Sequence, residues 1–136
     1  MRSREELREI MIENAAEINR LKQRIDEMFR RRDESEDAQR EWSLACREMH
    51  TRYNYLCLPG GWDAGFLDRL QSGDTYAIEV ALCFLEVRPY FFRSGYHWKT
   101  IFQKCKRAPM AGQQAERFAD LVARHDKWKQ RKNKRK

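Results

Sequence analysis

The sequence lacks the long apolar runs, export signals and paired cysteine motifs that mark several large classes of protein. No stretch of about 18 apolar residues occurs, so no transmembrane helix is expected. The first ten residues are charged throughout and contain no apolar signal segment, which favours a cytoplasmic protein. The four cysteines include no CxxC pair, and we expect them to be free thiols in a reducing compartment.

Motifs for catalysis, metal binding and phosphate binding are missing as well. The glycines do not form a phosphate loop followed by Lys and Ser or Thr. Cys46 and His50 would share one face of a helix, but no further ligands stand at a zinc-site spacing. The carboxylates of residues 33–41 are interleaved with arginines, which is typical of a solvated surface. We therefore expect no enzyme, no metal and no cofactor.

The bulk composition favours one helical domain with charged outer faces. The chain has 136 residues, of which 41% are hydrophobic and 36% are charged. This length is usual for a single domain. The charged fraction is high and the apolar fraction slightly low for a globular domain, which indicates long helices with solvated faces rather than a thick core.

The excess positive charge is confined to the C-terminal end. The net charge is +7, and residues 1–126 carry as many acidic as basic side chains. The candidate polyanion-binding residues are Lys127, Lys129, Arg131, Lys132, Lys134, Arg135 and Lys136. We expect residues 127–136 to form a disordered basic tail. Without a known DNA- or RNA-binding signature, such a tail favours nonspecific contact with nucleic acid.

Residues 4 to about 32 repeat apolar side chains at heptad spacing, which predicts an amphipathic helix. Ser3 and Glu6 have the spacing of a capping box at its start. The predicted seam consists of Met11, Asn14, Ile18, Leu21, Ile25 and Met28. Such a seam packs either on the body of its own chain or against a second copy in a coiled-coil dimer. The pattern fits both arrangements.

A polar segment and a Pro-Gly-Gly break divide the predicted helices. Residues 30–41 are almost free of apolar side chains, which favours a turn within a helical hairpin, although a single helix of about 50 residues also fits. Pro59, Gly60 and Gly61 form the clearest break. We therefore expect a helical arm at 1–56 and a compact helical core at 57–126.

The core region is predicted to contain three or four short helices. Their expected ranges are 63–71, 75–87, 95–107 and 111–126. The second is apolar nearly all round and is expected to be the central buried helix. Ser94 is expected to cap the third. The fold class is therefore all-α, with antiparallel helix pairs as in a small bundle or a HEAT-like pair.

The string PYFFRSGY stands out as a candidate interaction surface. Its candidate partner-binding residues are Arg88, Tyr90, Phe91, Phe92, Arg93 and Tyr96. Aromatic side chains beside arginine form hot spots for protein partners and also stacking platforms for bases. Alternatively, the aromatics close one end of the helical core while Arg93 pairs with Glu86 or Asp74.

Several signals follow one another in residues 50–125. They are Pro59-Gly60-Gly61, then Gly73-Asp74, then FLEVRPYFFRSGY, and then Lys106 to Pro109 in the order KRAP. In these signals the chain resembles a family of small bacterial helical proteins without an established activity. The resemblance implies a bacterial cytoplasmic helical protein, and it implies no activity. The predicted heptad seam and basic tail are not part of it.

These features favour a non-enzymatic bacterial protein-interaction module of the immunity-protein or adaptor type. It would bind a protein partner, or a second copy, through the arm and the PYFFRSGY face. The alternative is a nucleic-acid-associated protein. In that case the basic tail supplies affinity for RNA or DNA, and Arg88, Tyr90, Phe92 and Arg93 supply a stacking surface.

Overall fold

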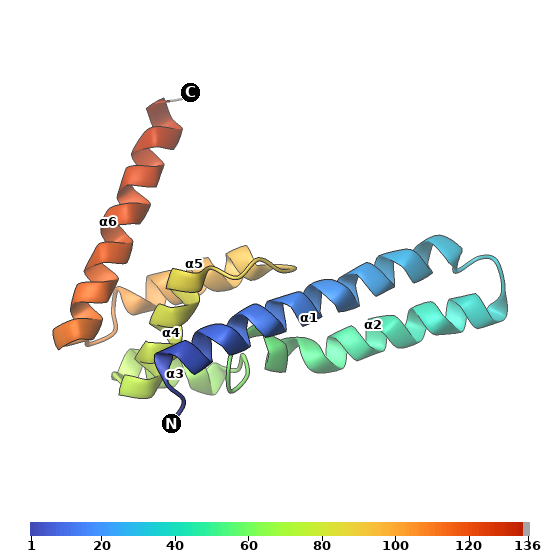
Figure 1. The fold of residues 1–136 in the computed structure, drawn as a ribbon, viewed down its shortest axis with the longest axis horizontal. Helices are drawn as coiled ribbons and strands as arrows, with labels where there is room; N and C mark the ends of the chain where they lie inside the picture. The colour runs from blue at the N-terminus through green and yellow to red at the C-terminus, as the bar shows by residue number, and fades with distance from the viewer. Residues whose placement is uncertain (135–136) are drawn as a thin grey trace.

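The computed structural model describes residues 1–134, which form six helices and contain no strand. The helices are α1 (Arg4–Arg31), α2 (Glu36–Cys57), α3 (Ala64–Ser72), α4 (Thr75–Val87), α5 (Ser94–Cys105) and α6 (Gly112–Lys134). The expected all-helical class is confirmed for this part of the chain. Helices α1 and α2 lie antiparallel and extend to one side, whereas α6 projects from the other side (Figure 1). No helix in residues 1–134 combines the length and the apolar character needed to cross a membrane.

Polar side chains define where the first four helices begin. The amide of Glu6 donates to Ser3 Oγ over 3.2 Å, and the amide of Ser3 donates to Glu6 Oε1 over 3.4 Å, which completes a capping box. Ser35, Asp63 and Asp74 accept from the amide three residues onward at the starts of α2, α3 and α4. Each cap satisfies an N–H group that has no partner within the helix, a contribution of about 1 kcal/mol.

The end of α3 depends on a glycine for two reasons. Gly73 has φ +90°, a left-handed conformation that side chains rarely adopt. A Cβ atom at this position would also lie 2.7 Å from Pro109 Cγ. The close approach therefore sets the segment that leads into α6 directly against the turn between α3 and α4.

Helix α4 is the centre of the packing and is buried on almost every side. Phe84 is 1% exposed, and α4 contacts α1, α3, α5 and α6. The same buried cluster includes Leu7 and Met11 from the first half of α1. The segments 1–56 and 57–126, expected as arm and core, therefore share one hydrophobic core.

The predicted heptad seam packs within this chain. Met11, Ile18 and Leu21 are buried, and Asn14, Ile25 and Met28 are half-buried. Met11, Ile18 and Leu21 belong to the buried hydrophobic cluster, Ile25 packs against it, and α1 contacts α2 and α4. The buried part of the seam therefore packs against helices of the same chain.

The C-terminal segment differs from the expectation. Residues 127–134 continue α6 as a helix, where a disordered tail was expected. Lysine, arginine and glutamine are good helix formers, and positive charge in the last turn interacts favourably with the helix dipole. Arg135 and Lys136, which belong to the predicted polyanion-binding set, lie outside the described residues.

Candidate interaction surface

The loop between α4 and α5 separates the aromatic side chains of PYFFRSGY into one anchor and three exposed groups. Phe91 is only 4% exposed and packs edge-on against Phe84, with ring centroids 6.4 Å apart. Tyr90 is 87% exposed, Tyr96 is 74% exposed and Phe92 is 45% exposed. Phe91 therefore closes the end of the core, as one hypothesis held, while its neighbours face solvent.

The backbone of this loop is held from three helices. Asn19 of α1 donates from its side-chain amide to the carbonyl oxygen of Tyr90 over 2.9 Å. Tyr53 of α2 donates from its hydroxyl to the carbonyl oxygen of Phe92. The amide of Phe91 donates to Ser94 Oγ over 3.2 Å. The exposed aromatics are thus presented on a fixed backbone, which lowers the conformational entropy lost on binding.

The role of Ser94 differs from the one predicted. Helix α5 begins at Ser94, the capping position is Arg93, and no side chain caps this end of the helix. The Ser94 hydroxyl instead accepts from Phe91, so it stabilises the loop. The spacing of a capping serine does not reveal whether the hydroxyl turns forward into the helix or back into the preceding loop.

Two arginines bracket the loop in left-handed conformations. Arg88 has φ +49° and Arg93 has φ +68°, a region where non-glycine residues cost about 1 kcal/mol. The Arg88 guanidinium lies 4.6 Å from the ring centroid of Trp98, and that of Arg93 lies 5.2 Å from Phe92. Glycine would fit both backbones with less strain.

The expected pairing of Arg93 with Glu86 or Asp74 is wrong. Within residues 1–134, Arg93 takes part in no ion pair. Glu86 binds Arg117 and Arg8 instead, and Asp74 caps α4. Arg93 is therefore left with its charge beside an exposed aromatic ring.

Open hollows flank Phe92 on both sides. One, of about 300 Å³, is lined by side chains of α2 together with Phe92 and Arg93. The other, of about 430 Å³, is lined by Asn19 and Lys22 of α1 and by the loop. Lys22 Nζ lies 5.6 Å from the Phe92 ring centroid. The surface thus alternates protruding rings with hollows, and its unpaired positive charge is that of Arg93, because Lys22 is paired with Asp26.

A Tyr-His-Cys cluster that sequence reasoning missed lies beneath the loop. His97 Nε2 is 3.2 Å from the Tyr53 hydroxyl and 3.6 Å from Cys57 Sγ. Burial raises the pKa of the Cys57 thiol to about 11 and raises the pKa of Tyr53 as well. Burial and, secondarily, Arg93 lower the pKa of His97. All three groups are therefore neutral near pH 7, and the protonated thiol is a poor nucleophile.

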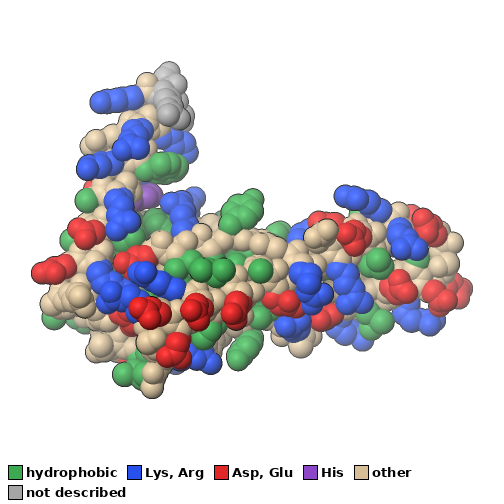
Figure 2. Space-filling model, in the orientation of Figure 1, with side chains coloured by type: hydrophobic (Ala, Val, Ile, Leu, Met, Phe, Trp, Pro, Cys, Tyr) green, Lys and Arg blue, Asp and Glu red, His purple; other side chains and the backbone are tan. Residues whose placement is uncertain are grey.

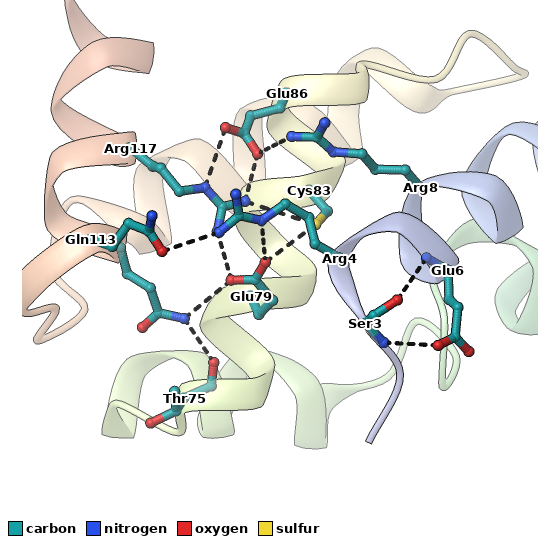
Figure 3. A network of polar contacts seen from close by, with 11 residues as sticks. Ser3, Arg4, Glu6, Arg8, Thr75, Glu79, Cys83, Glu86, Gln113 and Arg117 are labelled. Carbon is teal, nitrogen blue, oxygen red and sulfur yellow. Dashed lines mark hydrogen bonds and ion pairs between the residues drawn. The ribbon is translucent and has the colours of Figure 1, made fainter.

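Arg117 forms a second buried polar centre that no sequence pattern predicted. Figure 3 shows its guanidinium between Glu79 and Glu86 of α4. Its Nη1 and Nη2 atoms lie 2.6 Å from the two carboxylates, and its Nε donates to Glu86 over 3.3 Å. Arg4 and Arg8 of α1 approach the same carboxylates to 3.1 Å. This network joins α1, α4 and α6, and it positions the base of α6.

The described residues bring no group of three or more potential metal ligands together, so Cys46 and His50 gain no further ligand in residues 1–134. Comparison with models of protein families, with curated proteins and with solved structures finds no match to this chain. The function must therefore be inferred from the geometry of the chain's own surfaces.

Proposed function

We propose that this chain is a non-enzymatic protein-interaction module that receives a protein partner on the loop at residues 88–93, the first turn of α5 and the adjoining sides of α1 and α2. One observation carries the proposal. Tyr90 and Phe92 are exposed on a loop backbone that α1 and α2 hold by hydrogen bonds and that two strained arginines bracket, and Tyr96 is exposed on the first turn of α5 beside them. Rigid, exposed aromatic groups beside arginine are the typical anchors of protein interfaces.

The partner's chemistry follows from the surface. The hollows on either side of Phe92 suit apolar or aromatic side chains, because rings and aliphatic groups form part of their walls. Arg93 supplies positive charge at the edge and forms no ion pair within residues 1–134, whereas Lys22 is paired with Asp26 over 2.6 Å. We therefore expect a partner segment with protruding apolar side chains flanked by Asp or Glu. The α1/α2 arm extends the contact area beyond the loop.

The test compares three forms of the chain as bait in a lysate of cells that naturally express it. The test variant carries Tyr90→Ala and Phe92→Ala. The matched control carries Tyr55→Ala, because Tyr55 is 66% exposed on α2 and lines neither hollow. We expect a partner that the wild type and Tyr55→Ala retain equally and that the loop variant loses. With that partner purified, the loop variant should bind at least about 30-fold more weakly, as for a hot spot of about 2 kcal/mol.

The variant Arg93→Gly distinguishes the contribution of the Arg93 side chain to binding from that of the loop backbone. Glycine suits φ +68° and should not impair folding, so weaker binding by this variant would come from loss of the guanidinium. Unchanged partner binding by both loop variants would refute the proposal. Light scattering of the wild type shows whether the partner is a second copy, because the mass in solution would then be twice that of the chain.

A further inference from the structure

A row of aromatic rings leads from the core to the exposed part of α6. The Trp98 and Phe102 rings of α5 are stacked, with centroids 4.9 Å apart. His125 of α6 lies 5.3 Å from Trp98, and Trp128 lies 5.8 Å from His125 in a stacked orientation. Trp98 and Phe102 are buried, whereas Trp128 is 48% exposed. The row thus ends in a ring that is fixed on its inner side and open to solvent.

The α6 members of this row continue the face of α6 that packs against the rest of the chain. Leu121 is the last buried residue of α6, and His125, Trp128 and Lys132 follow at helical spacing on the same side. Beyond Leu121 the face meets the rest of the chain through His125, whose ring centroid lies 4.9 Å from that of Phe102, and from Asp126 onward the side chains are exposed. A hollow of about 200 Å³ at this point is lined by Arg88, Trp98, Arg124, His125 and Trp128 together with Leu85, Glu86 and Leu121. The carboxylate of Glu86 is paired with Arg117 and Arg8.

The surroundings of this row are positively charged. From Arg124 onward, α6 contains six basic side chains and one acid, Asp126. All six bases are exposed, and none forms an ion pair within residues 1–134. Figure 2 shows these basic side chains gathered along the projecting part of α6. The projecting helix therefore carries a concentrated, uncompensated positive field.

Cations also lie against the rings themselves. Lys132 Nζ is 5.1 Å from the Trp128 centroid, and Lys106 Nζ is 5.0 Å from that of Phe102. Partial burial lowers the pKa of His125, and Lys129, Arg88 and Lys106 lower it further against the opposing effect of Asp126. The imidazole is therefore a neutral, flat ring near pH 7, held among positive charges.

We propose that the projecting half of α6 and the hollow at its base bind single-stranded nucleic acid. A base stacks on the open side of Trp128, and the phosphates on either side of it contact Arg124, Lys129 and Lys132. Lys132 leaves the ring face when the base arrives and takes a phosphate. Stacked aromatic rings within a basic surface are the usual means of binding single strands without sequence preference.

Other occupants fit this surface less well. Residues 123–134 contain only Ala123 and Trp128 as apolar side chains, so α6 has no apolar face to enter a membrane surface. Duplex nucleic acid would meet the positive charge, but its paired bases are not free to stack on Trp128. An acidic protein would likewise leave the ring row unused. This proposal goes beyond the protein-interaction function and does not depend on it, because Tyr90 and Phe92 lie outside the α6 surface.

The experiment is a fluorescence-anisotropy titration of the full chain with labelled single strands of mixed sequence. RNA and DNA strands are compared with the duplex of the same sequence and with heparin, a polyanion without bases. We expect single strands to bind more tightly than the duplex, and the tighter of RNA and DNA identifies the natural ligand. Trp128→Leu should weaken single-strand binding about 10-fold, as for loss of one stacked base, and Trp128→Phe should restore most of it. Heparin binding by Trp128→Leu should be unchanged.

Charge and stacking are separated by a second variant. Lys129→Gln combined with Lys132→Gln should weaken both single-strand and heparin binding and reduce the salt slope of log K by about 1.4, or about 0.7 per lost phosphate contact. The Tyr90→Ala, Phe92→Ala chain serves as the control and should bind single strands as the wild type does. Equal single-strand affinity of Trp128→Leu and wild type, or equal affinity for the duplex and single strands, would overturn the proposal.

Discussion

The molecule has two projecting parts, the α1/α2 pair and the C-terminal half of α6, and they differ in the distribution of their charged side chains. The far end of the α1/α2 pair shows basic and acidic side chains side by side, whereas the projecting half of α6 is almost wholly basic (Figure 2). In α1 and α2 the charges are paired, for example Arg24 with Glu48 over 3.2 Å and Arg52 with Glu17 over 2.9 Å. In α6 the charges beyond Arg117 have no such partners within residues 1–134.

The two parts also differ in what holds them. The α1/α2 pair has a buried apolar seam that includes Ile18 and Leu21. Its tip is closed by Phe29 and Trp42, with ring centroids 5.8 Å apart, and by Arg32 stacked 3.5 Å from the Phe29 centroid. Helix α6 is anchored only at its base. In the α1/α2 pair, neighbouring charges of opposite sign form ion pairs with one another. On the projecting half of α6, the basic side chains have no such partners and remain available to a ligand.

The largest effect is expected from placing one acidic residue in each part. Ile18→Asp buries an unpaired carboxylate at a position that is fully buried, and it should cost at least about 4 kcal/mol of unfolding free energy. Gln130→Asp adds the same charge on exposed α6 and should change stability by less than about 0.5 kcal/mol. Urea unfolding followed by circular dichroism measures both. A folded, monomeric Ile18→Asp would contradict the intramolecular seam.

A smaller effect, of about 3 kcal/mol, is expected for Arg117→Met at neutral pH. This change leaves Glu79 and Glu86 half-buried with only Arg4 and Arg8 beside them. In the wild type, burial acts to raise the pKa of both carboxyls, but the hydrogen bonds from Arg117 and the α1 arginines outweigh it and the pKa values are lowered. The arginine contacts therefore stabilise the fold above the ordinary glutamate pKa, and this stability is lost as the pH falls through the lowered pKa values.

The stability of the Arg117→Met variant should depend on pH in the opposite direction. Without Arg117, burial dominates and the pKa values of Glu79 and Glu86 rise. Protonation as the pH falls then removes the unpaired buried charge of the variant, so the stability difference from the wild type should shrink between pH 7 and pH 4. Thermal unfolding across this range measures the difference. A difference that stays constant with pH would mean that Arg117 acts through packing alone.

The smallest expected effect is that of ionic strength on the helicity of α6. Like charges along α6 repel one another, and raising the ionic strength from about 0.01 M to about 0.15 M shortens the Debye length from about 30 Å to about 8 Å. We expect the helical signal at 222 nm to rise slightly for the full chain, because screening removes a few tenths of a kcal/mol of repulsion. A chain ending at Asp126 should show no rise. Equal responses of the two chains would place the effect in the α1/α2 pair.

Local rules predicted much of the fold. The capping box of Ser3 and Glu6 could be predicted because it stands just before a periodic apolar run. The apolar residues on all sides of α4 predicted its central position. These features depend on a few neighbouring residues, which is the range over which sequence patterns are informative.

Features set by distant residues could not be read in this way. The Arg117 network joins residues more than thirty positions apart, and nothing near Arg117 distinguishes it from the exposed arginines. The division of the aromatic string into a buried Phe91 and an exposed Phe92 depends on where Asn19 and Tyr53 meet the loop backbone. The length of α6 was underestimated because a lysine-rich composition suits both a helix and a disordered segment.

The thiols of this chain differ in chemical accessibility. Cys57, Cys83 and Cys105 are buried, and burial raises the pKa of Cys105 to about 12. Cys46 is half-exposed and lines the hollow beside Phe92. An alkylating fluorophore offered to the folded protein therefore reaches Cys46 first. The unmodified sequence thus carries its own labelling site at the edge of the aromatic loop, where an environment-sensitive dye would report a bound partner without any engineered cysteine.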